Sequence, residues 1–322
     1  MRFGSRTSLA LAVAFAAAVG LARDHASAQT ARAGGDVHPD LQGVWLNDTA
    51  TPLERTKDFV DHAFFTPAQA REYESHYQLD RTAAISHGDP VFELQAAGDL
   101  DTYEPGHVLP SLRTSLITDP ADGKVPALTP DAARRLAERN ARAREHFAEN
   151  PEDFTNAERC LITGNAAVPP LLPVFYNNGL RIVQTTEAVM IESEMNHDAR
   201  VISLTRRQHL PPTIRRWLGD SIGHWEGGTL VVDTTNFTEH TTIRGSGLDL
   251  HVIERFTADG PSTIRYQFTI DDPSFVRTWS AESLFRKTDS PMYEYACHEA
   301  NYSIVNVLRG ARLAEREGTQ TR

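Results

Sequence analysis

Three short stretches of the sequence combine histidine with carboxylates, and such groups could carry acid–base chemistry. General acid–base catalysis needs a group that titrates near neutral pH, which an imidazole or a desolvated carboxylate supplies. Guanidinium and aromatic side chains beside such a group could hold a substrate and steady developing negative charge. We predict as catalytic residues His197, Asp198, His224, His298 and Glu299, and as substrate-binding residues Arg215, Trp217, Trp225, Asp233 and Tyr302.

Each of these residues also has a structural interpretation. His197 stands in an Asn-His-Asp turn sequence, where it could simply serve the turn. Trp217 and Trp225 could belong to a core or cover one end of a barrel. His298 and Glu299 are consecutive, and consecutive strand residues face opposite sides, so only one of them could point into a barrel.

The sequence contains no HEXXH zinc motif, no P-loop and no G-x-G-x-x-G fingerprint. We therefore predict no cofactor and no metal site, and we disfavour nucleotide hydrolysis and dinucleotide-dependent chemistry. A metal site assembled from scattered histidines is the alternative that the sequence leaves open.

The first 28 residues have the pattern of a cleavable secretory signal peptide. Arg2 and Arg6 precede an apolar run over residues 9–21, and residues 26–28 (Ala-Ser-Ala) match a signal peptidase site. The run is shorter than the roughly 20 apolar residues that span a bilayer. We predict a periplasmic or secreted protein with no membrane insertion after cleavage. The periplasm lacks a supply of ATP or reduced nicotinamide, so cofactors of these kinds are not expected.

Two cysteines, Cys160 and Cys297, are present. An even count in an oxidising compartment predicts one disulfide, and a bridge over so long a loop would stabilise the fold by about 4 to 5 kcal/mol in the chain-entropy account. A reactive thiol or a metal thiolate is the alternative, although no CxxC spacing supports either.

The formal net charge is −11 at pH 7. An acidic surface argues against nucleic acid and anionic membranes as partners. We predict a small hydrophobic or aromatic molecule as the partner, and composition leaves the oligomeric state open.

The fold expected is mainly β: an antiparallel up-and-down, lipocalin-like barrel with an N-terminal helical and loop-rich extension. Short alternating runs follow one another between turn sequences, and a meander of about eight strands usually closes into a barrel. Thr66-Pro67 and Thr129-Pro130 each have the sequence of a helix start. The expected organisation is a signal peptide (1–28), a disordered linker (29–39), an N-terminal strand with a wrapping segment (40–160), the barrel core (161–310) and a polar tail (311–322).

The strand boundaries come from alternation of apolar and polar residues. Residues 263–271 alternate most clearly, and further strands are expected at 181–185, 188–194, 200–204, 223–237 (two), 250–258, 278–286 and 293–299. A short helical turn is expected over 211–217. Residues 231, 233 and 235 share one face of their strand, and residues 251, 253, 255 and 257 share one face of theirs. We expect these mixed polar and apolar faces to line the barrel interior, which would suit a ligand.

Much of the chain resembles a family of secreted bacterial proteins found in proteobacteria and acidobacteria. The stretches that carry the resemblance are PDLQGVWLNDTATPLER, RTSLITDPADGKVPALT, ERCL, HDARVI, HLPPTIRRWLGDSIGHWEGGTLVVDTTNF and YEYACHEANY. GVW at residues 43–45 is similar to the Gly-x-Trp of the first strand in lipocalin-like barrels. The resemblance implies export and a lipocalin-like barrel, and it implies no activity.

Three functions remain open. The first is a cofactor-free barrel enzyme, a lyase, isomerase or hydrolase, that acts on a small hydrophobic or aromatic molecule by His/carboxylate catalysis. The second is a lipocalin-type binding or carrier protein that uses the same cavity without chemistry. The third is a structural or interaction module of the envelope. A pocket lined by histidine and carboxylate would favour the first, an apolar pocket the second, and a filled barrel the third.

Overall fold

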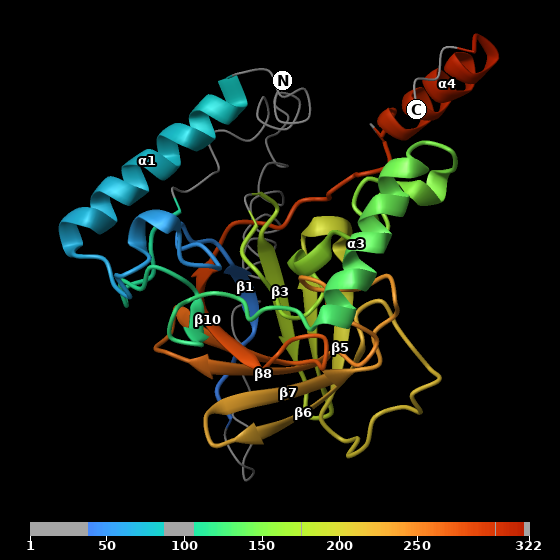
Figure 1. Cartoon of the computed structure of the whole chain (residues 1–322). Coiled ribbons are helices and arrows are strands. Elements are labelled where there is room, and N and C mark those ends of the chain that lie inside the picture. The colour runs from blue at the N-terminus through green and yellow to red at the C-terminus, as the bar shows by residue number, and fades with distance from the viewer. Residues whose placement is uncertain (1–37, 87–105, 175, 300, 319–322) are drawn as a thin grey trace, which may run out of the picture. The chain divides into compact units, whose positions relative to one another are not determined.

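The computed structural model describes residues 38–86, 106–174, 176–299 and 301–318. The expected signal peptide, nearly all of the expected linker and the last residues of the expected tail lie outside these ranges. Within them, nine strands form a closed barrel in the order β1-β3-β4-β5-β6-β7-β8-β9-β10, and β10 pairs back onto β1 (Figure 1). A tenth strand, β2, pairs with the first part of β10 on the edge that faces away from β9, the same edge that β1 joins further along.

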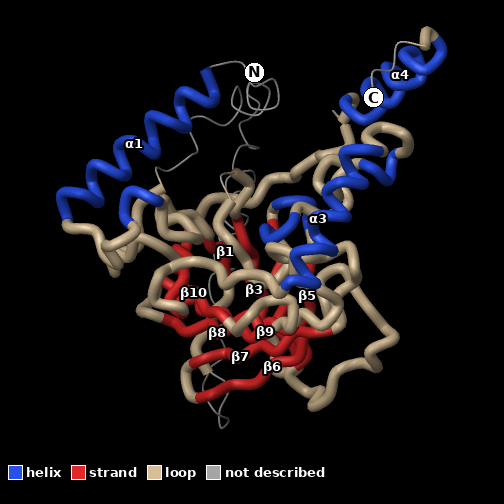
Figure 2. The backbone as a smooth tube through the Cα atoms, in the orientation of Figure 1, coloured by secondary structure: helices blue, strands red, loops and turns tan. Residues whose placement is uncertain are grey.

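Figure 2 shows the strands together and the loops and helices that connect them. The strands are β1 (Gly43–Leu46), β2 (Ile117–Asp119), β3 (Gly179–Gln184), β4 (Ala188–Ser193), β5 (Ala199–Ser203), β6 (Asp220–Glu226), β7 (Thr229–Thr235), β8 (His251–Ala258), β9 (Thr263–Asp271) and β10 (Trp279–Thr288). The helices are α1 (Pro67–Ser86), α3 (Pro130–Glu145) and α4 (Ser303–Arg316), with short 3-10 turns η1 (Lys57–Phe59), η2 (Pro151–Asp153), η3 (Gly164–Ala166) and η4 (Met195–His197).

The mainly β barrel is confirmed, but the all-antiparallel order is wrong at one place. β5 and β6 pair in parallel, with Ser203 opposite Ile222. The long connection over residues 204–219 causes this, because it leaves the end of β5 and returns to start β6 in the same direction. A parallel pair needs such a crossover, since a tight hairpin can join only antiparallel strands. Residues 211–217, where we expected a helical turn, form turns of this crossover instead.

The barrel interior is filled with side chains. On β9 the predicted apolar face is the buried one, with Ile264, Tyr266, Phe268 and Ile270 at most 2% exposed. Aromatic rings from three strands pack there: the Tyr266 ring lies 4.8 Å from that of Phe285, between ring centroids. Small barrels are commonly plugged by side chains in this way, and this one is a packed core.

On β7 and β8 the faces are the reverse of our expectation. Val232 on β7 and Val252 and Glu254 on β8 point inward and are fully buried, while Asp233 and His251 lie on the outer wall and are partly exposed. The expectation failed because both faces of these strands carry apolar residues, so alternation alone does not say which face is covered.

The last expected strand, at residues 293–299, is absent from the structure. The barrel is already closed by the β1–β10 pair, so it does not need this segment as a further strand. Residues 289–299 instead run as an irregular segment, and the helix α4 follows it.

Both predicted helix starts are confirmed by capping hydrogen bonds. The Thr129 hydroxyl accepts from the Ala132 N–H at 3.4 Å, ahead of Pro130 in the first turn of α3. At α1, Thr66 and Gln69 form reciprocal bonds between side chain and backbone, at 3.3 and 2.8 Å. α3 buries only Ala132, which agrees with the expected surface position of this helix.

Candidate functional site

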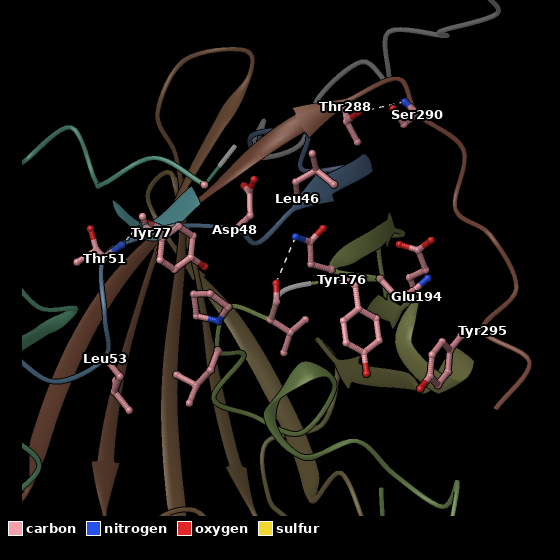
Figure 3. A pocket seen from close by; sticks show the side chains of 18 of the residues that line it. Leu46, Asp48, Thr51, Leu53, Tyr77, Tyr176, Glu194, Thr288, Ser290 and Tyr295 are labelled. Atoms are coloured by element: carbon pink, nitrogen blue, oxygen red, sulfur yellow. Dashed lines mark hydrogen bonds between the residues drawn. The ribbon is translucent and has the colours of Figure 1, made fainter. Parts of the chain in front are cut away.

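A cavity of about 950 Å³ lies at the end of the barrel where β1 ends, β3 begins and β4 ends (Figure 3). Four parts of the chain supply most of its wall: residues 48–53 after β1, residues 172–174 and 176–178 before β3, the helix α1, and residues 288–296 at and after the end of β10. A volume of this size is typical of small-molecule sites, which hold roughly 300 to 1,000 Å³. Leu46 and Thr288 are the strand residues among the described lining, so loops and a helix build most of the wall.

Five of the described residues that line the cavity are tyrosines. Tyr73 and Tyr77 come from α1, and Tyr73 packs against a small second core that contains Phe65, with ring centroids 5.1 Å apart. Tyr176 and Tyr295 lie against one another in another part of the wall, with ring centroids 6.2 Å apart and ring planes inclined by 38°. Figure 3 shows this pair in the same part of the cavity wall as Glu194. Tyrosines of this kind offer a large apolar face and a polar tip.

The loop after β1 is held in place by a network of short polar contacts. The Thr49 hydroxyl donates to the His107 carbonyl at 2.7 Å, and the Thr51 hydroxyl accepts from the Leu109 N–H at 2.9 Å. Asp48 receives two bonds from Arg286 on β10, at 2.8 and 3.0 Å. These contacts give the cavity a preformed wall on this side, and the Asp48 charge is already neutralised.

Glu194, just after β4, joins three parts of the cavity wall. One carboxylate oxygen accepts from the Tyr293 N–H at 3.0 Å and the other from the Gly179 N–H at 3.2 Å. The residue is only 8% exposed, and no ion pair reaches its carboxylate from the described part of the chain. Gly179 allows the close approach, because a Cβ at that position would lie 2.7 Å from a Glu194 oxygen.

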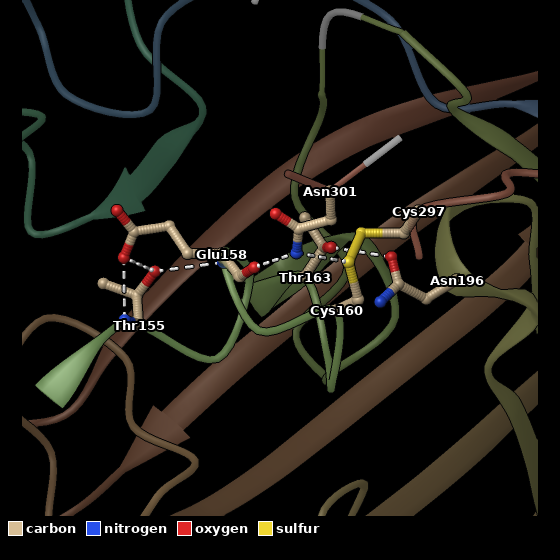
Figure 4. Close-up of a disulfide and its surroundings, with 7 residues drawn as sticks. All are labelled: Thr155, Glu158, Cys160, Thr163, Asn196, Cys297 and Asn301. Carbon is tan, nitrogen blue, oxygen red and sulfur yellow. Dashed lines mark hydrogen bonds between the residues drawn. A yellow bond between two sulfur atoms is a disulfide. The ribbon is translucent and has the colours of Figure 1, made fainter. Parts of the chain in front are cut away.

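A disulfide between Cys160 and Cys297 fastens the segment that forms the outer cavity wall (Figure 4). The predicted pairing is confirmed. Tyr295 and Ala296 line the cavity directly before Cys297, and the Tyr295 N–H donates to the His197 ring at 3.0 Å. Asn301 adds a bond from its side chain to the Glu158 carbonyl. The irregular segment is thereby held without any strand pairing.

A second set of polar groups lies on the outer wall of the barrel, where β6, β7 and β8 run side by side. The His209 ring bridges two carboxylates, with one nitrogen 3.1 Å from Asp220 and the other 3.0 Å from Asp233. His251 approaches the same Asp233 oxygen at 2.9 Å, and Arg206 binds Asp220 through both of its terminal nitrogens at 2.9 and 3.0 Å. We call these five residues the outer-wall network.

The contacts of the outer-wall network shift its pKa values. Burial by itself would raise the pKa of Asp220, but hydrogen bonds from Arg206, the Leu210 N–H and His209 outweigh burial and lower it to about 2. The hydrogen bond to Asp233 raises the pKa of His251, against the opposing effect of burial. The network thus holds ionised carboxylates beside an imidazole that favours its charged form.

Gly219 positions the start of this network. Its φ of 71° lies in the left-handed region, and an added Cβ would lie 2.6 Å from the Thr234 side chain and 2.8 Å from the Thr235 carbonyl oxygen. Only glycine fits there. The chain can therefore turn sharply out of the crossover and place Asp220 at the first position of β6.

A third set of polar groups is buried inside the barrel, and we call it the inner network. Arg200 on β5 binds Glu254 on β8 through both terminal nitrogens, one of them at 3.0 Å. The Tyr266 hydroxyl donates to Glu254 at 2.9 Å and accepts from the Leu171 N–H at 2.8 Å. Arg200 is 3% exposed and Glu254 is fully buried. The sequence places Tyr266 on the apolar face of its strand, but it gives Arg200 and Glu254 no interior role.

The structure places the predicted catalytic residues apart from one another. His197 lies in η4 and contacts the cavity-wall segment, whereas His224 lies on the outside of β6, 3.1 Å from Glu226. His298 and Glu299 are exposed beyond the disulfide. None of the five predicted catalytic residues is among those that line the cavity.

The predicted substrate-binding residues are likewise dispersed. Arg215 donates to the Phe237 and Leu248 carbonyls, Trp217 stacks on His240, and Trp225 stacks on His38 with ring centroids 4.6 Å apart. Tyr302 is 70% exposed. Asp233 alone joins a cluster with histidines, the outer-wall network.

Asp198 has the chemistry that we expected of an acid–base residue, but not the location. Burial raises the pKa of its carboxyl to about 6, and the nearby His197 only partly offsets this. One of its oxygens is buried without a hydrogen-bond partner. The residue lies behind η4, next to the turn that contacts the disulfide, and not on the cavity surface.

Residues 219–223 spell G-x-S-x-G, the pattern of a nucleophile elbow. Such an elbow needs a sharp turn from a strand into a helix, with the serine exposed at its tip. Here Ser221 lies within β6, is 3% exposed, and its hydroxyl is 2.9 Å from that of Thr234. The surroundings of Ser221 therefore do not support a hydrolase nucleophile.

No described group of three or more His, Cys, Asp or Glu residues is arranged to hold a metal ion. No helix in the described ranges is long and apolar enough to cross a bilayer. No family model matches the chain, and neither a curated protein nor a solved structure is similar to it. The cavity and the two networks are therefore the features of this chain that bear on its function.

Glu194, Tyr176 and Tyr295 are the cavity residues that sequence reasoning missed. Glu194 ends a strand next to the predicted His197 turn, so its position was a usable signal. The tyrosines at 293 and 295 alternate with other residues, and this alternation predicts a strand instead of a cavity wall.

Proposed function

We propose that this protein binds a small, partly aromatic or hydrophobic molecule in the cavity at the mouth of its barrel. The observation that carries the proposal is a cavity of about 950 Å³ whose wall combines tyrosine, proline and leucine side chains with a nearly equal share of polar and charged side chains. Ligand sites in proteins join apolar walls to placed polar groups that orient the ligand, and this wall offers both.

Binding fits the cavity better than catalysis. No histidine is among the described residues that line it. Of the three carboxylates among those residues, Asp48 is paired with Arg286, Glu194 is held by backbone N–H groups and Glu294 is exposed. The packed barrel interior by itself would favour a purely structural module. The preformed cavity above that interior is what favours a binding protein.

We also propose that the protein works in the periplasm or outside the cell. The disulfide between Cys160 and Cys297 supports this, because such bonds persist in oxidising compartments. The sequence of residues 1–28 supports it independently.

A second candidate function is a cofactor-free enzyme, a lyase, isomerase or hydrolase. The hydrogen-bonded series His251–Asp233–His209–Asp220 favours it, because it joins two imidazoles to two carboxylates. Such a series can move a proton between its ends. It lies on the outer wall and not in the cavity, so this function ranks second.

Native mass spectrometry of the protein isolated from the compartment to which it is exported tests the proposal. We expect a bound small molecule that Tyr176→Ala weakens at least ten-fold, because that substitution removes one ring of the facing pair. The matched control is Tyr302→Ala, since Tyr302 is exposed outside the cavity and should leave binding unchanged.

The same sample separates the two candidate functions. Recovery of the bound molecule unchanged after prolonged incubation supports binding, and its conversion supports the enzyme. A preparation without any bound molecule, and equal binding by Tyr176→Ala and the unsubstituted protein, would each contradict the proposed cavity function.

A further inference from the structure

We infer that the ligand of the mouth cavity carries a positive charge, as an organic ammonium group, and that this group sits between Glu194 and the Tyr176–Tyr295 pair. The inference rests on the proposed binding function and adds the chemical class of the ligand. Three observations carry it: the unused acceptor capacity of Glu194, the geometry of the two rings, and the balance of charge on the wall.

Glu194 has acceptor capacity that its protein contacts do not use. An ionised carboxylate offers about four lone-pair sites, and the described residues fill two of them, through the N–H groups of Tyr293 and Gly179. A carboxylate this deeply buried is normally paired with a cation. Glu194 is 8% exposed, lines the cavity, and has no ion pair within the described ranges. A cationic ligand would supply the missing partner.

The facing tyrosines suit the same group. Tyr176 and Tyr295 are inclined by 38° with centroids 6.2 Å apart, so the pair opens on one side. A cation within about 6 Å of a ring centroid is attracted by the ring face. Figure 3 shows both rings on the side of the cavity where Glu194 lies. A group placed there meets aromatic faces and a carboxylate together.

The other charges of the wall do not oppose a cation. Asp48 is paired with Arg286, which leaves Glu194 and the exposed Glu294 against one guanidinium, that of the exposed Arg244. A structural clamp explains the two backbone bonds of Glu194, and it requires a carboxylate, because an amide has only one acceptor oxygen. The clamp leaves the negative charge of Glu194 without a cation among the described residues, and an ammonium group would supply that cation.

The test compares two probes of the same shape on the unsubstituted protein. Phenyltrimethylammonium and its uncharged carbon analogue tert-butylbenzene differ only in the charge at the quaternary centre, and ligand-observed NMR titration measures both. We expect the cation to bind at least ten-fold more tightly. Equal affinities would overturn the inference and leave the small-molecule function standing. Binding of neither probe would count against both.

Substitution of Glu194 supplies an independent measurement. Glu194→Gln keeps the size of the side chain and removes its charge, and it also gives up one of the two backbone hydrogen bonds, because an amide has a single acceptor oxygen. We expect it to abolish the preference for the cation over tert-butylbenzene. Glu192→Gln is the matched control, since it alters the same strand outside the cavity. A cation preference that persists in Glu194→Gln, with near-ultraviolet circular dichroism unchanged, would overturn the inference.

Discussion

The two charge networks of the barrel lie on opposite faces of neighbouring strands, and they differ in what holds them. The inner network is sealed: Glu254 is fully buried and receives bonds from Arg200 and Tyr266. The outer-wall network is partly solvated, and two of its five members are histidines. We therefore expect the inner network to stabilise the fold at every pH, and the stabilisation by the outer-wall network to change with pH.

The difference shows what burial does to a charge. Inside the barrel a charge must be paired, since an unpaired buried ion costs several kcal/mol. On the outer wall Asp220 is also fully buried, but Asp233 and His251 are partly exposed, so water competes with the contacts of these two residues and screens them. The same kind of carboxylate–cation contact is thus essential for stability at Glu254, whereas its contribution to stability at Asp233 depends on solvent conditions.

The largest effect is expected from Glu254→Gln. This change leaves the Arg200 charge buried without its counter-ion, so we expect a loss of about 3 to 5 kcal/mol in the free energy of unfolding. Urea denaturation followed by circular dichroism measures it. Glu226→Gln, which removes an exposed partner of Arg255, is the control and should be neutral. A loss below about 1 kcal/mol for Glu254→Gln would show that the inner network is not the sealed structure described above.

A smaller effect is expected from Asp220→Asn in the outer-wall network. The folded-state pKa of about 2 lies below the ordinary value of 3.8, so the ionised group stabilises the fold above pH 4, and this contribution is lost as the pH falls toward 2. The shift corresponds to at most about 2 kcal/mol. We expect Asp220→Asn to cost this amount at pH 7 and little at pH 2.

Denaturant titrations at both pH values test the Asp220 prediction. Asp259→Asn, in an exposed pair with Arg265, is the control. An equal cost of Asp220→Asn at pH 7 and pH 2 would mean that the lost stability comes from packing and not from charge.

The sequence predicts the barrel well because its strands depend on local patterns. The clean alternation of residues 263–271 matches β9 in both its bounds and its buried face. The helix starts at Thr129-Pro130 and Thr66-Pro67 also depend on neighbouring residues alone. At these places the interactions between neighbouring residues are enough to determine the secondary structure.

The parts that failed depend on contacts between distant residues. The direction of β6 is set by how a 16-residue connection returns, which alternation cannot show. The inward face of β8 depends on Glu254 meeting Arg200, 54 residues away. The cavity is assembled from four separate stretches, so Glu194 had no local signal that linked it to Tyr176.

The smallest effect, and the one that most sharply separates the networks, is expected from His251→Gln. The hydrogen bond to Asp233 raises the folded-state pKa of His251 above 6.5. The stabilisation is therefore complete below pH 6.5 and is lost as the pH rises through the folded-state pKa. We expect a loss of about 0.5 to 1 kcal/mol in the free energy of unfolding at pH 5.5 and none at pH 9, as for a partly exposed ion pair.

Thermal unfolding at the two pH values measures this loss, with His224→Gln as the exposed control. A pH-independent cost would place His251 with the inner network, as a packing residue, and would remove the contrast between the two.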